Sequence, residues 1–177
     1  ARDGLRVVPV AVNLSARQFG RDGLVDWVGD LLRECGLDAS QLEVEITESA
    51  VMDNAERAAA VLDRLHTMGV KVSLDDFGTG YSSLGYLKRF PVDCVKIDRS
   101  FISDIPRDKD DVAITRAVIA MAHSLQLKVV AEGVETAEQV RFLQEHGCDE
   151  LQGYWFGQPC DAAAFAKLLE APPRKLS

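Results

Sequence analysis

Short apolar runs alternate along the chain with longer stretches in which apolar residues recur every three or four positions. The short runs predict buried strands, and the longer stretches predict amphipathic helices. The expected strands are Val7–Leu14, Leu42–Thr47, Val70–Asp75, Asp93–Asp98, Lys128–Glu132 and a weaker Leu151–Phe156. The expected helices are Leu24–Cys35, Asn54–Met68, Ser83–Arg89, Asp111–Leu125, Ala137–His146 and Ala162–Glu170. Strands and helices therefore alternate strictly, which predicts a parallel sheet with helices outside it.

Two architectures share this alternation, a doubly wound open sheet and a (β/α)₈ barrel. A complete barrel has eight strands and typically about 250 residues. The chain has 177 residues, and its pattern predicts six βα units. It would then be a barrel in which about two units are missing.

The residues at the carboxyl ends of the predicted strands favour the barrel. Each strand ends in or beside polar residues: Asn13, Glu45 and Glu48, Asp75 and Asp76, Lys96 and Asp98, Glu132 and Glu135, and Gln152. An open sheet uses mainly the crevice at its switch point, whereas a barrel builds its active site from all strand ends. Charged strand ends can also be merely solvated loop starts. That reading is weaker here because Glu45 and Lys96 lie inside apolar strands. We therefore predict an incomplete TIM-type barrel.

Composition narrows the class of ligand and the compartment. The chain has 28 acidic and 20 basic residues, a net charge of −8 and a pI near 4.9, which argues against a DNA- or RNA-binding protein. An anionic ligand would need divalent cations to offset the repulsion.

No apolar run reaches the about 20 residues that span a membrane, and there is no signal peptide. We therefore expect a cytoplasmic domain over residues 1–171, followed by a tail at 172–177. The four cysteines lack zinc-site spacing and are expected to be reduced thiols.

The strand-end residues have the chemistry of a hard-metal site. Oxygen ligands of the kind that Mg²⁺ and Mn²⁺ prefer are offered by Asn13, Glu45, Asp75, Asp76 and Glu132. Adjacent aspartates suit two metal ions about 4 Å apart, which assist phosphoryl chemistry by stabilising the attacking and leaving oxygens. Lys96 adds a positive charge for a phosphate oxygen or a water. The Gly-rich segment Asp76–Ser83 is either an ordinary turn or a mobile gate over the site.

Six segments in order resemble one family, the EAL-domain cyclic-di-GMP phosphodiesterases. They cover nearly the whole chain and read VNLSARQF (Val12–Phe19), LEVEITES (Leu42–Ser49), DDFGTGYSSLGYL (Asp75–Leu87), VKID (Val95–Asp98), VVAEGVET (Val129–Thr136) and QGYWFGQP (Gln152–Pro159). DDFGTGYSSL and AEGVE are the most specific of them. The resemblance implies a (β/α)₈-type barrel that hydrolyses cyclic-di-GMP to linear pGpG with two divalent metal ions, Mg²⁺ or Mn²⁺.

The resemblance also implies a role for each matching residue. Asn13, Glu45, Asp75 and Asp76 would bind the metals, and Glu132 would bind a metal or help activate the water. Lys96 would hold the nucleophilic water. Gln152 would complete the site, Phe156 and Pro159 would lie near a guanine, and Glu48 would anchor the Asp76–Ser83 loop. The family also implies a homodimer and an upstream sensory or GGDEF (diguanylate cyclase) domain.

One family feature is missing from the 177 residues. The Glu-Ala-Leu motif and the arginine that follows it, expected about a quarter-barrel before VNLS, do not occur. We therefore expect a fragment without one metal ligand and one phosphate contact, with weak turnover or none by itself. Two alternatives stay open beside the phosphodiesterase. One is a non-catalytic cyclic-di-GMP receptor, and the other is a protein-interaction module that pairs through its exposed sheet edge.

Overall fold

The computed structural model describes residues 7–80 and 84–170, and within them six strands form one parallel sheet. The strands are β1 (Val10–Leu14), β2 (Leu42–Thr47), β3 (Lys71–Phe77), β4 (Cys94–Ile97), β5 (Lys128–Ala131) and β6 (Glu150–Leu151). Each strand pairs with the next one along the chain, so the order is β1-β2-β3-β4-β5-β6. A doubly wound sheet reverses its order at a switch point, whereas a barrel keeps it. The prediction of barrel topology over an open doubly wound sheet is confirmed.

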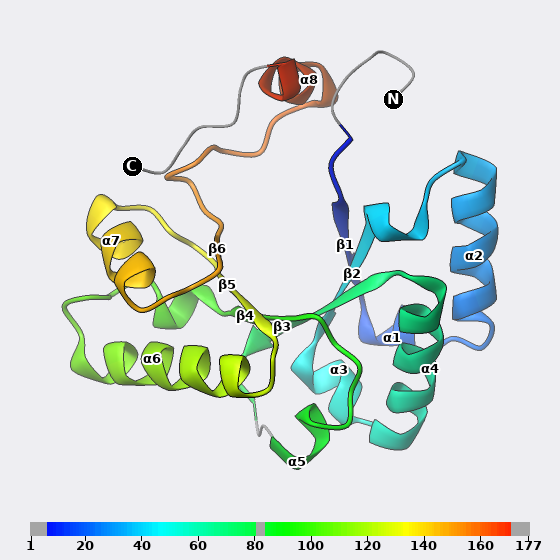
Figure 1. Cartoon of the computed structure of the whole chain (residues 1–177), viewed down its shortest axis with the longest axis horizontal. Helices are drawn as coiled ribbons and strands as arrows, with labels where there is room; N and C mark the ends of the chain where they lie inside the picture. The colour runs from blue at the N-terminus through cyan, green and yellow to red at the C-terminus, as the bar shows by residue number, and fades with distance from the viewer. Residues whose placement is uncertain (1–6, 81–83, 171–177) are drawn as a thin grey trace.

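Helices cover the outer face of the curved sheet (Figure 1). They are α1 (Ala16–Phe19), α2 (Leu24–Cys35), α3 (Glu48–Met52), α4 (Ala55–Met68), α5 (Leu84–Leu87), α6 (Lys109–Ser124), α7 (Ala137–Glu145) and α8 (Ala162–Glu170), with 3₁₀ turns η1 (Ala39–Gln41) and η2 (Arg99–Phe101). In Figure 1, α8 lies apart from the others, across the open concave side of the sheet between β6 and β1. The six strands thus form a half-barrel whose inner face looks toward α8.

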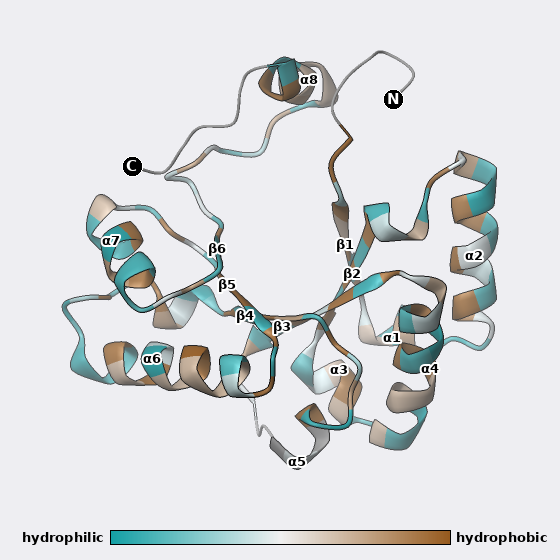
Figure 2. Cartoon of the chain, viewed as in Figure 1, coloured by the Kyte–Doolittle hydropathy of each residue, from teal (hydrophilic) through white to brown (hydrophobic). Residues whose placement is uncertain are grey.

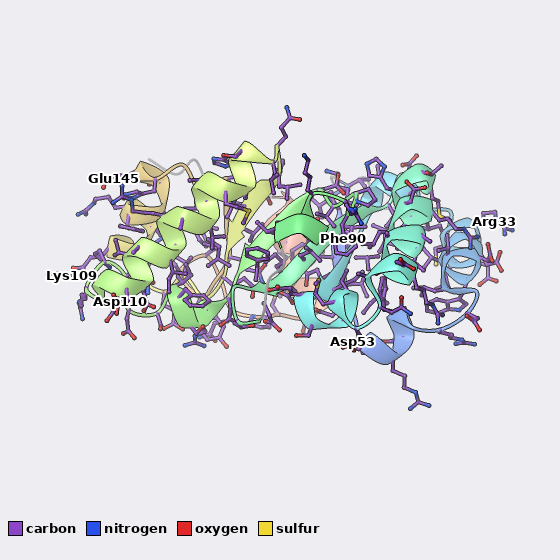
Figure 3. All side chains as sticks on the ribbon, turned by 90° about the horizontal axis from the view of Figure 1, so that it is seen from below. Arg33, Asp53, Phe90, Lys109, Asp110 and Glu145 are labelled. Atoms are coloured by element: carbon purple, nitrogen blue, oxygen red, sulfur yellow. The ribbon has the colours of Figure 1, made fainter. Side chains whose placement is uncertain are left out.

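Alternation along the strands separates an apolar outer face from a polar inner face. Outward side chains such as Ile46, Val72, Val95 and Val129 are fully buried under the helices. Figure 2 shows the strands as largely hydrophobic, with mixed character along the helices. The side view in Figure 3 places Phe90 in the interior, while charged residues lie at the periphery: Arg33 on α2, Lys109 and Asp110 on α6, and Glu145 on α7.

Element boundaries follow the sequence pattern closely, with one clear correction. The expected strand Leu151–Phe156 is wrong beyond Leu151, because β6 covers only Glu150–Leu151. The backbone of Gly153 lies so close to Val134 that a Cβ there would be 2.2 Å from the Val134 carbonyl oxygen. The chain turns there, with the Phe156 N–H donating to the Gly153 carbonyl at 3.1 Å. Ser83, the expected start of the α5 helix, and the tail at 172–177 lie outside the described residues.

The short helices α1 and α3 and the two 3₁₀ turns were not predicted from the pattern, because three to five residues are too few for an amphipathic repeat. Of these, α1 had a readable signal. Ser15 accepts a hydrogen bond from the Gln18 N–H and the Gln18 side chain accepts from the Ser15 N–H, which is a capping box. No helix within the described part of the chain is long and apolar enough to cross a membrane.

Asp149 connects α6 to the start of β5, and we predict that it stabilises the fold. Its Oδ2 accepts hydrogen bonds from the Val129 N–H and from His123, each at 2.9 Å. Burial would raise the pKa of Asp149, but these hydrogen bonds outweigh it and lower the pKa below 3.8. Asp149→Ala leaves a buried N–H unpaired, so we expect a loss of about 1–3 kcal/mol in the free energy of unfolding.

Denaturant titration of the wild type and Asp149→Ala at several pH values measures this effect. A carboxyl whose pKa is lowered by folding stabilises the protein above its unfolded-state pKa, and this contribution disappears as the pH falls through the folded-state pKa. The difference in the free energy of unfolding between the two proteins should therefore be largest at neutral pH and decrease below pH 3.8. Asp63→Ala, at an exposed carboxylate on α4, is the control and should change little. Equal stability of Asp149→Ala and wild type at pH 7 would contradict the assignment.

Candidate active site at the carboxyl ends of the strands

The ammonium group of Lys96, on β4, is at the centre of a buried cluster of carboxylates. Its Nζ lies 2.6 Å from Glu45 Oε1 on β2, 2.6 Å from Glu132 Oε1 after β5, and 3.7 Å from Asp75 Oδ1 on β3. Only 4% of the Lys96 side chain is exposed. A buried lysine is stable as a cation only when anionic partners surround it. Three neighbouring strands and the residue that follows β5 therefore contribute one charged side chain each to a single cluster.

Strand register explains why these residues meet. Glu45 is paired with Asn13 on β1 and with Ser73 on β3, so all three occupy the same level of the sheet. Their side chains share the inner face, because residues opposite each other in a parallel ladder point the same way. Asn13, an expected metal ligand, is thus beside Glu45, although its own side chain is exposed.

A β-bulge brings both aspartates to the cluster. Leu74 pairs with Val95 and Phe77 pairs with Ile97, which leaves two residues of β3 opposite the single Lys96. An extra residue of this kind interrupts the inward and outward alternation. The extra residue is Asp76, whose φ of 54° is left-handed, a conformation that aspartate adopts more readily than most residues. The Asp76 N–H donates to Asp75 Oδ1 at 3.0 Å. Asp75 faces Lys96 by regular alternation from Leu74, and the extra residue returns Phe77 to the buried outer face.

The ionisation of the cluster reflects this crowding. Burial disfavours the charged form of Lys96, but hydrogen bonds to Glu132 and Glu45 more than offset it, so the Lys96 pKa is raised and the side chain stays protonated. Burial also raises the pKa of Glu132, against the effect of Lys96. The pKa of Asp76 is raised by burial and by the nearby charges of Asp75 and Asp98. The cluster therefore has an excess of negative charge that a further cation would relieve.

The donor set fits a hard divalent cation in its chemistry, because carboxylate oxygens predominate. Within residues 7–80 and 84–170, no three His, Cys, Asp or Glu side chains converge as a finished metal site. The carboxylates of Glu45 and Glu132 are instead directed at Lys96. Each contacts the lysine through Oε1, so a metal ion could be bound through the second oxygen of either carboxylate.

A cavity of about 660 Å³ joins the cluster to the loop after β6. Glu45 and Lys96 form part of its wall, and so do Gln152, Phe156 and Pro159. All three residues that the family resemblance assigns to the ligand therefore share a cavity with two of the charged residues. Phe165 and Leu168 of α8 complete the far side.

The loop after β3 is attached to Glu48, as the resemblance suggests for a loop anchor. Glu48 is buried at the start of α3, and its Oε2 accepts a hydrogen bond from the Gly78 N–H at 3.4 Å. The expected gate, Asp76–Ser83, is described only as far as residue 80, and residues 81–83 lie outside the described part. The anchor role of Glu48 stays a prediction, which this contact supports.

Three loops at the carboxyl edge of the sheet are cross-linked in a way that the sequence did not reveal. Val134, after β5, donates its N–H to the Gln152 carbonyl at 3.0 Å and accepts from the Trp155 N–H at 3.0 Å. On the other side, Arg99 forms an ion pair of 2.8 Å with Glu135 and packs over Gly133. No spacing rule signals such contacts, because the partners are far apart in the chain. Asp98, noted in the sequence only as a strand-end charge, is near enough to Asp76 to raise its pKa.

Comparison with known proteins gives consistent matches. A family model described as the EAL domain matches residues 1–159. Cyclic di-GMP phosphodiesterase NbdA of Pseudomonas aeruginosa is 52% identical over 162 residues, which cover 92% of this chain and 21% of NbdA. The bifunctional diguanylate cyclase/cyclic di-GMP phosphodiesterase MucR of the same organism is 51% identical over 153 residues, covering 86% of this chain and 22% of MucR. The chain thus spans about a fifth of the length of these relatives.

Solved structures agree with these matches. The PaMucR phosphodiesterase in complex with c-di-GMP superposes with a TM-score of 0.86 at 50% identity, covering 89% of this chain and 64% of that one. The EAL domain of Mycobacterium smegmatis DcpA gives 0.90 at 41% identity, with coverages of 96% and 76%. A manganese/cyclic-di-GMP complex of Klebsiella pneumoniae BlrP1 gives 0.79 at 37% identity, with coverages of 86% and 39%.

Proposed function

Since the chain belongs to the EAL-domain family, we propose that it is the hydrolytic part of a protein that converts cyclic-di-GMP to linear pGpG. NbdA is a cyclic-di-GMP phosphodiesterase, and MucR is both a cyclic-di-GMP phosphodiesterase and a diguanylate cyclase. The observation that carries the proposal is the cluster around Lys96, whose Nζ lies 2.6 Å from both Glu45 and Glu132. The cluster opens into a cavity that Gln152, Phe156 and Pro159 also line.

Two divalent metal ions, Mg²⁺ or Mn²⁺, complete the proposed site. Asn13, Glu45, Asp75, Asp76 and Glu132 would hold them. When bound, such ions supply Lewis-acid activation of a water and of the scissile phosphate. A BlrP1 structure is described as a manganese/cyclic-di-GMP complex and another as a calcium complex, which supports divalent cations in this family.

The chain's own residues have separate tasks in this proposal. Lys96 stays protonated, so it orients the attacking water and offsets phosphate charge rather than acting as a base. Glu132, whose pKa is raised by burial, is the better candidate to receive a proton from the water. Gln152 orients the ligand, while Phe156 and Pro159 offer apolar surface to a guanine.

The partners of the domain follow from the same family membership. We propose that it acts in the cytoplasm as a homodimer and follows a sensory or diguanylate-cyclase domain in its parent protein. The arrangement in MucR, which has both activities, supports the last point.

Incubation of the full-length protein with cyclic-di-GMP, followed by chromatography of the nucleotides, tests the function. We expect pGpG to form with Mg²⁺ or Mn²⁺, to stop forming after chelation by EDTA, and to return when Mn²⁺ is added back. Binding of cyclic-di-GMP without product in the presence of either metal would overturn the hydrolase in favour of a receptor. Equal rates with and without EDTA would refute the role of the metals.

A further inference from the structure

Gln139, on the first turn of α7, has a fully hydrogen-bonded side chain although it is buried. Only 3% of the Gln139 surface is exposed. The Oε1 atom accepts hydrogen bonds from the Glu135 N–H at 2.7 Å and the Thr136 N–H at 2.9 Å. Nε2 donates to the Ile102 carbonyl at 2.9 Å and the Ser103 carbonyl at 3.1 Å. All four hydrogen-bonding positions of the amide are therefore used.

These four hydrogen bonds join two loops at the catalytic edge. The carbonyl groups belong to the segment that follows η2, a few residues after Lys96. The N–H groups belong to the segment that follows β5, three and four residues after Glu132. Half of this arrangement is the usual capping box of α7, in which Gln139 caps the Thr136 N–H. The other half, directed at the Ile102 and Ser103 carbonyls, is not needed to start the helix.

We infer that Gln139 is a positioning residue, which fixes Glu132 relative to Lys96 by tying the loop after β5 to the loop after β4. This inference deepens the proposed function and rests on it. Only two residues, Gly133 and Val134, separate Glu132 from the segment that Gln139 holds. Both are themselves confined, Gly133 beneath Arg99 and Val134 against Gly153. A displacement of Glu135 would therefore pass to Glu132 instead of being absorbed between them.

Outer residues that orient the groups at a catalytic or metal site commonly change activity or metal affinity by about 10- to 100-fold when they are replaced. Gln139 touches neither Lys96 nor Glu132 and would act only through the position of Glu132. Its replacement should therefore lower kcat, and the KM for cyclic-di-GMP should stay unchanged. Gln139→Met preserves the length of the side chain and removes all four hydrogen bonds. Gln139→Glu preserves the two acceptor bonds to the backbone N–H groups and directs a carboxylate at the two carbonyl groups. It thus removes only the hydrogen bonds to the Ile102 and Ser103 carbonyls and keeps the cap of α7.

Val28→Ala is the matched control for stability. Val28, on α2, is buried in the core, and α2 lies on the opposite side of the molecule from α7 (Figure 1). We expect Gln139→Met and Gln139→Glu in the full-length protein to lower kcat about 10- to 100-fold, with Val28→Ala unchanged in kcat. A wild-type kcat in both Gln139 variants would overturn the inference, and so would an equal loss of kcat in Val28→Ala.

Amide hydrogen exchange, followed residue by residue, tests the inference without turnover. The N–H groups of Glu132 and Val134 bond to the Ile97 and Gln152 carbonyls, not to Gln139. If Gln139 holds the whole loop, both should exchange at least tenfold faster in Gln139→Glu and stay protected in Val28→Ala. Unchanged protection of Glu132 would leave Gln139 as a helix cap only and overturn the inference.

Two further arms keep the tests independent. If both Gln139 variants fail to fold, amide hydrogen exchange in the wild type tests the inference. The N–H groups of Val134 and Glu135 should then become exchangeable in one common opening step as denaturant is added. Independent opening of the two N–H groups would overturn the inference. If the wild type forms no pGpG under any metal condition, the proposed function fails by itself. The positioning of Glu132 is then still decided by the exchange measurement.

Discussion

Replacing Lys96 by methionine is expected to destabilise the fold by about 3–5 kcal/mol and to abolish turnover of cyclic-di-GMP. Methionine is of similar length but leaves Glu45 and Glu132 buried beside each other without their shared cation. Breaking a buried ion pair on one side is costly, because the remaining charge has no solvent to compensate it. Catalysis would be lost as well, since the proposed orienting cation is gone.

Lys128→Met is the matched control. Lys128, at the start of β5, pairs with Glu150 at 3.2 Å, but about 60% of each side chain is exposed. Exposed pairs of this kind contribute about 0–1 kcal/mol. Urea denaturation of both variants at pH 7 gives the comparison. Similar losses of stability in the two variants would show that the Lys96 cluster is not a true buried ion-pair network.

Asp75→Asn is expected to reduce turnover by more than the about 100-fold typical of outer-shell substitutions, while the fold is retained. The asparagine oxygen can still accept the Asp76 N–H, so the bulge should persist. The negative charge next to Lys96 disappears, and with it the proposed ligand that both metals share. The rate of pGpG formation at saturating Mn²⁺ measures the loss.

Asp93→Asn is the matched control for this change. Asp93 precedes β4 at the opposite end of the strand, where its Oδ2 accepts the Val72 N–H at 2.9 Å. An asparagine can retain that hydrogen bond, so turnover should stay near the wild-type rate. Retained turnover in Asp75→Asn would refute its assignment as a shared ligand. Lost turnover in both variants would point to a general defect of folding.

Much of the fold could be predicted because its signals are local. Helix α2 and strand β2 have the bounds that the hydrophobic period predicts, and Gly36 and Gly69 end α2 and α4 in left-handed conformations. Membership of the EAL family, inferred first from six motifs, is confirmed by a family match over residues 1–159. The predicted element that was wrong depends on a contact between residues far apart in the chain. The short β6 results from the packing of Gly153 against Val134, which no pattern in the β6 segment records.

The candidate site could likewise be predicted only where its signals are local. Charged residues inside apolar strands, Glu45 and Lys96, could be recognised from sequence, because an unpaired buried charge is too costly to occur without a partner. Their partners could not be assigned, since the 2.6 Å contacts join residues 51 and 36 positions apart. Gln139 resembles any polar residue at a helix start until the loops that it joins are seen in space. The individual roles of the site residues remain predictions, which the substitutions above test.

The bulge at Asp75 and Asp76 decides how β3 tolerates a change in length. Leu74 and Phe77 are both buried on the outer face, and the two aspartates between them lie opposite the single Lys96. Deleting Asp76 would leave one inward residue between them, so Phe77 would keep its place in the apolar layer and the ladder to β4 would become regular. If both aspartates stayed and the bulge were lost, Phe77 would instead face inward and Gly78 would take its place under the helices. The bulge therefore adds a second acidic residue to the strand end without exchanging the inside and outside of the sheet.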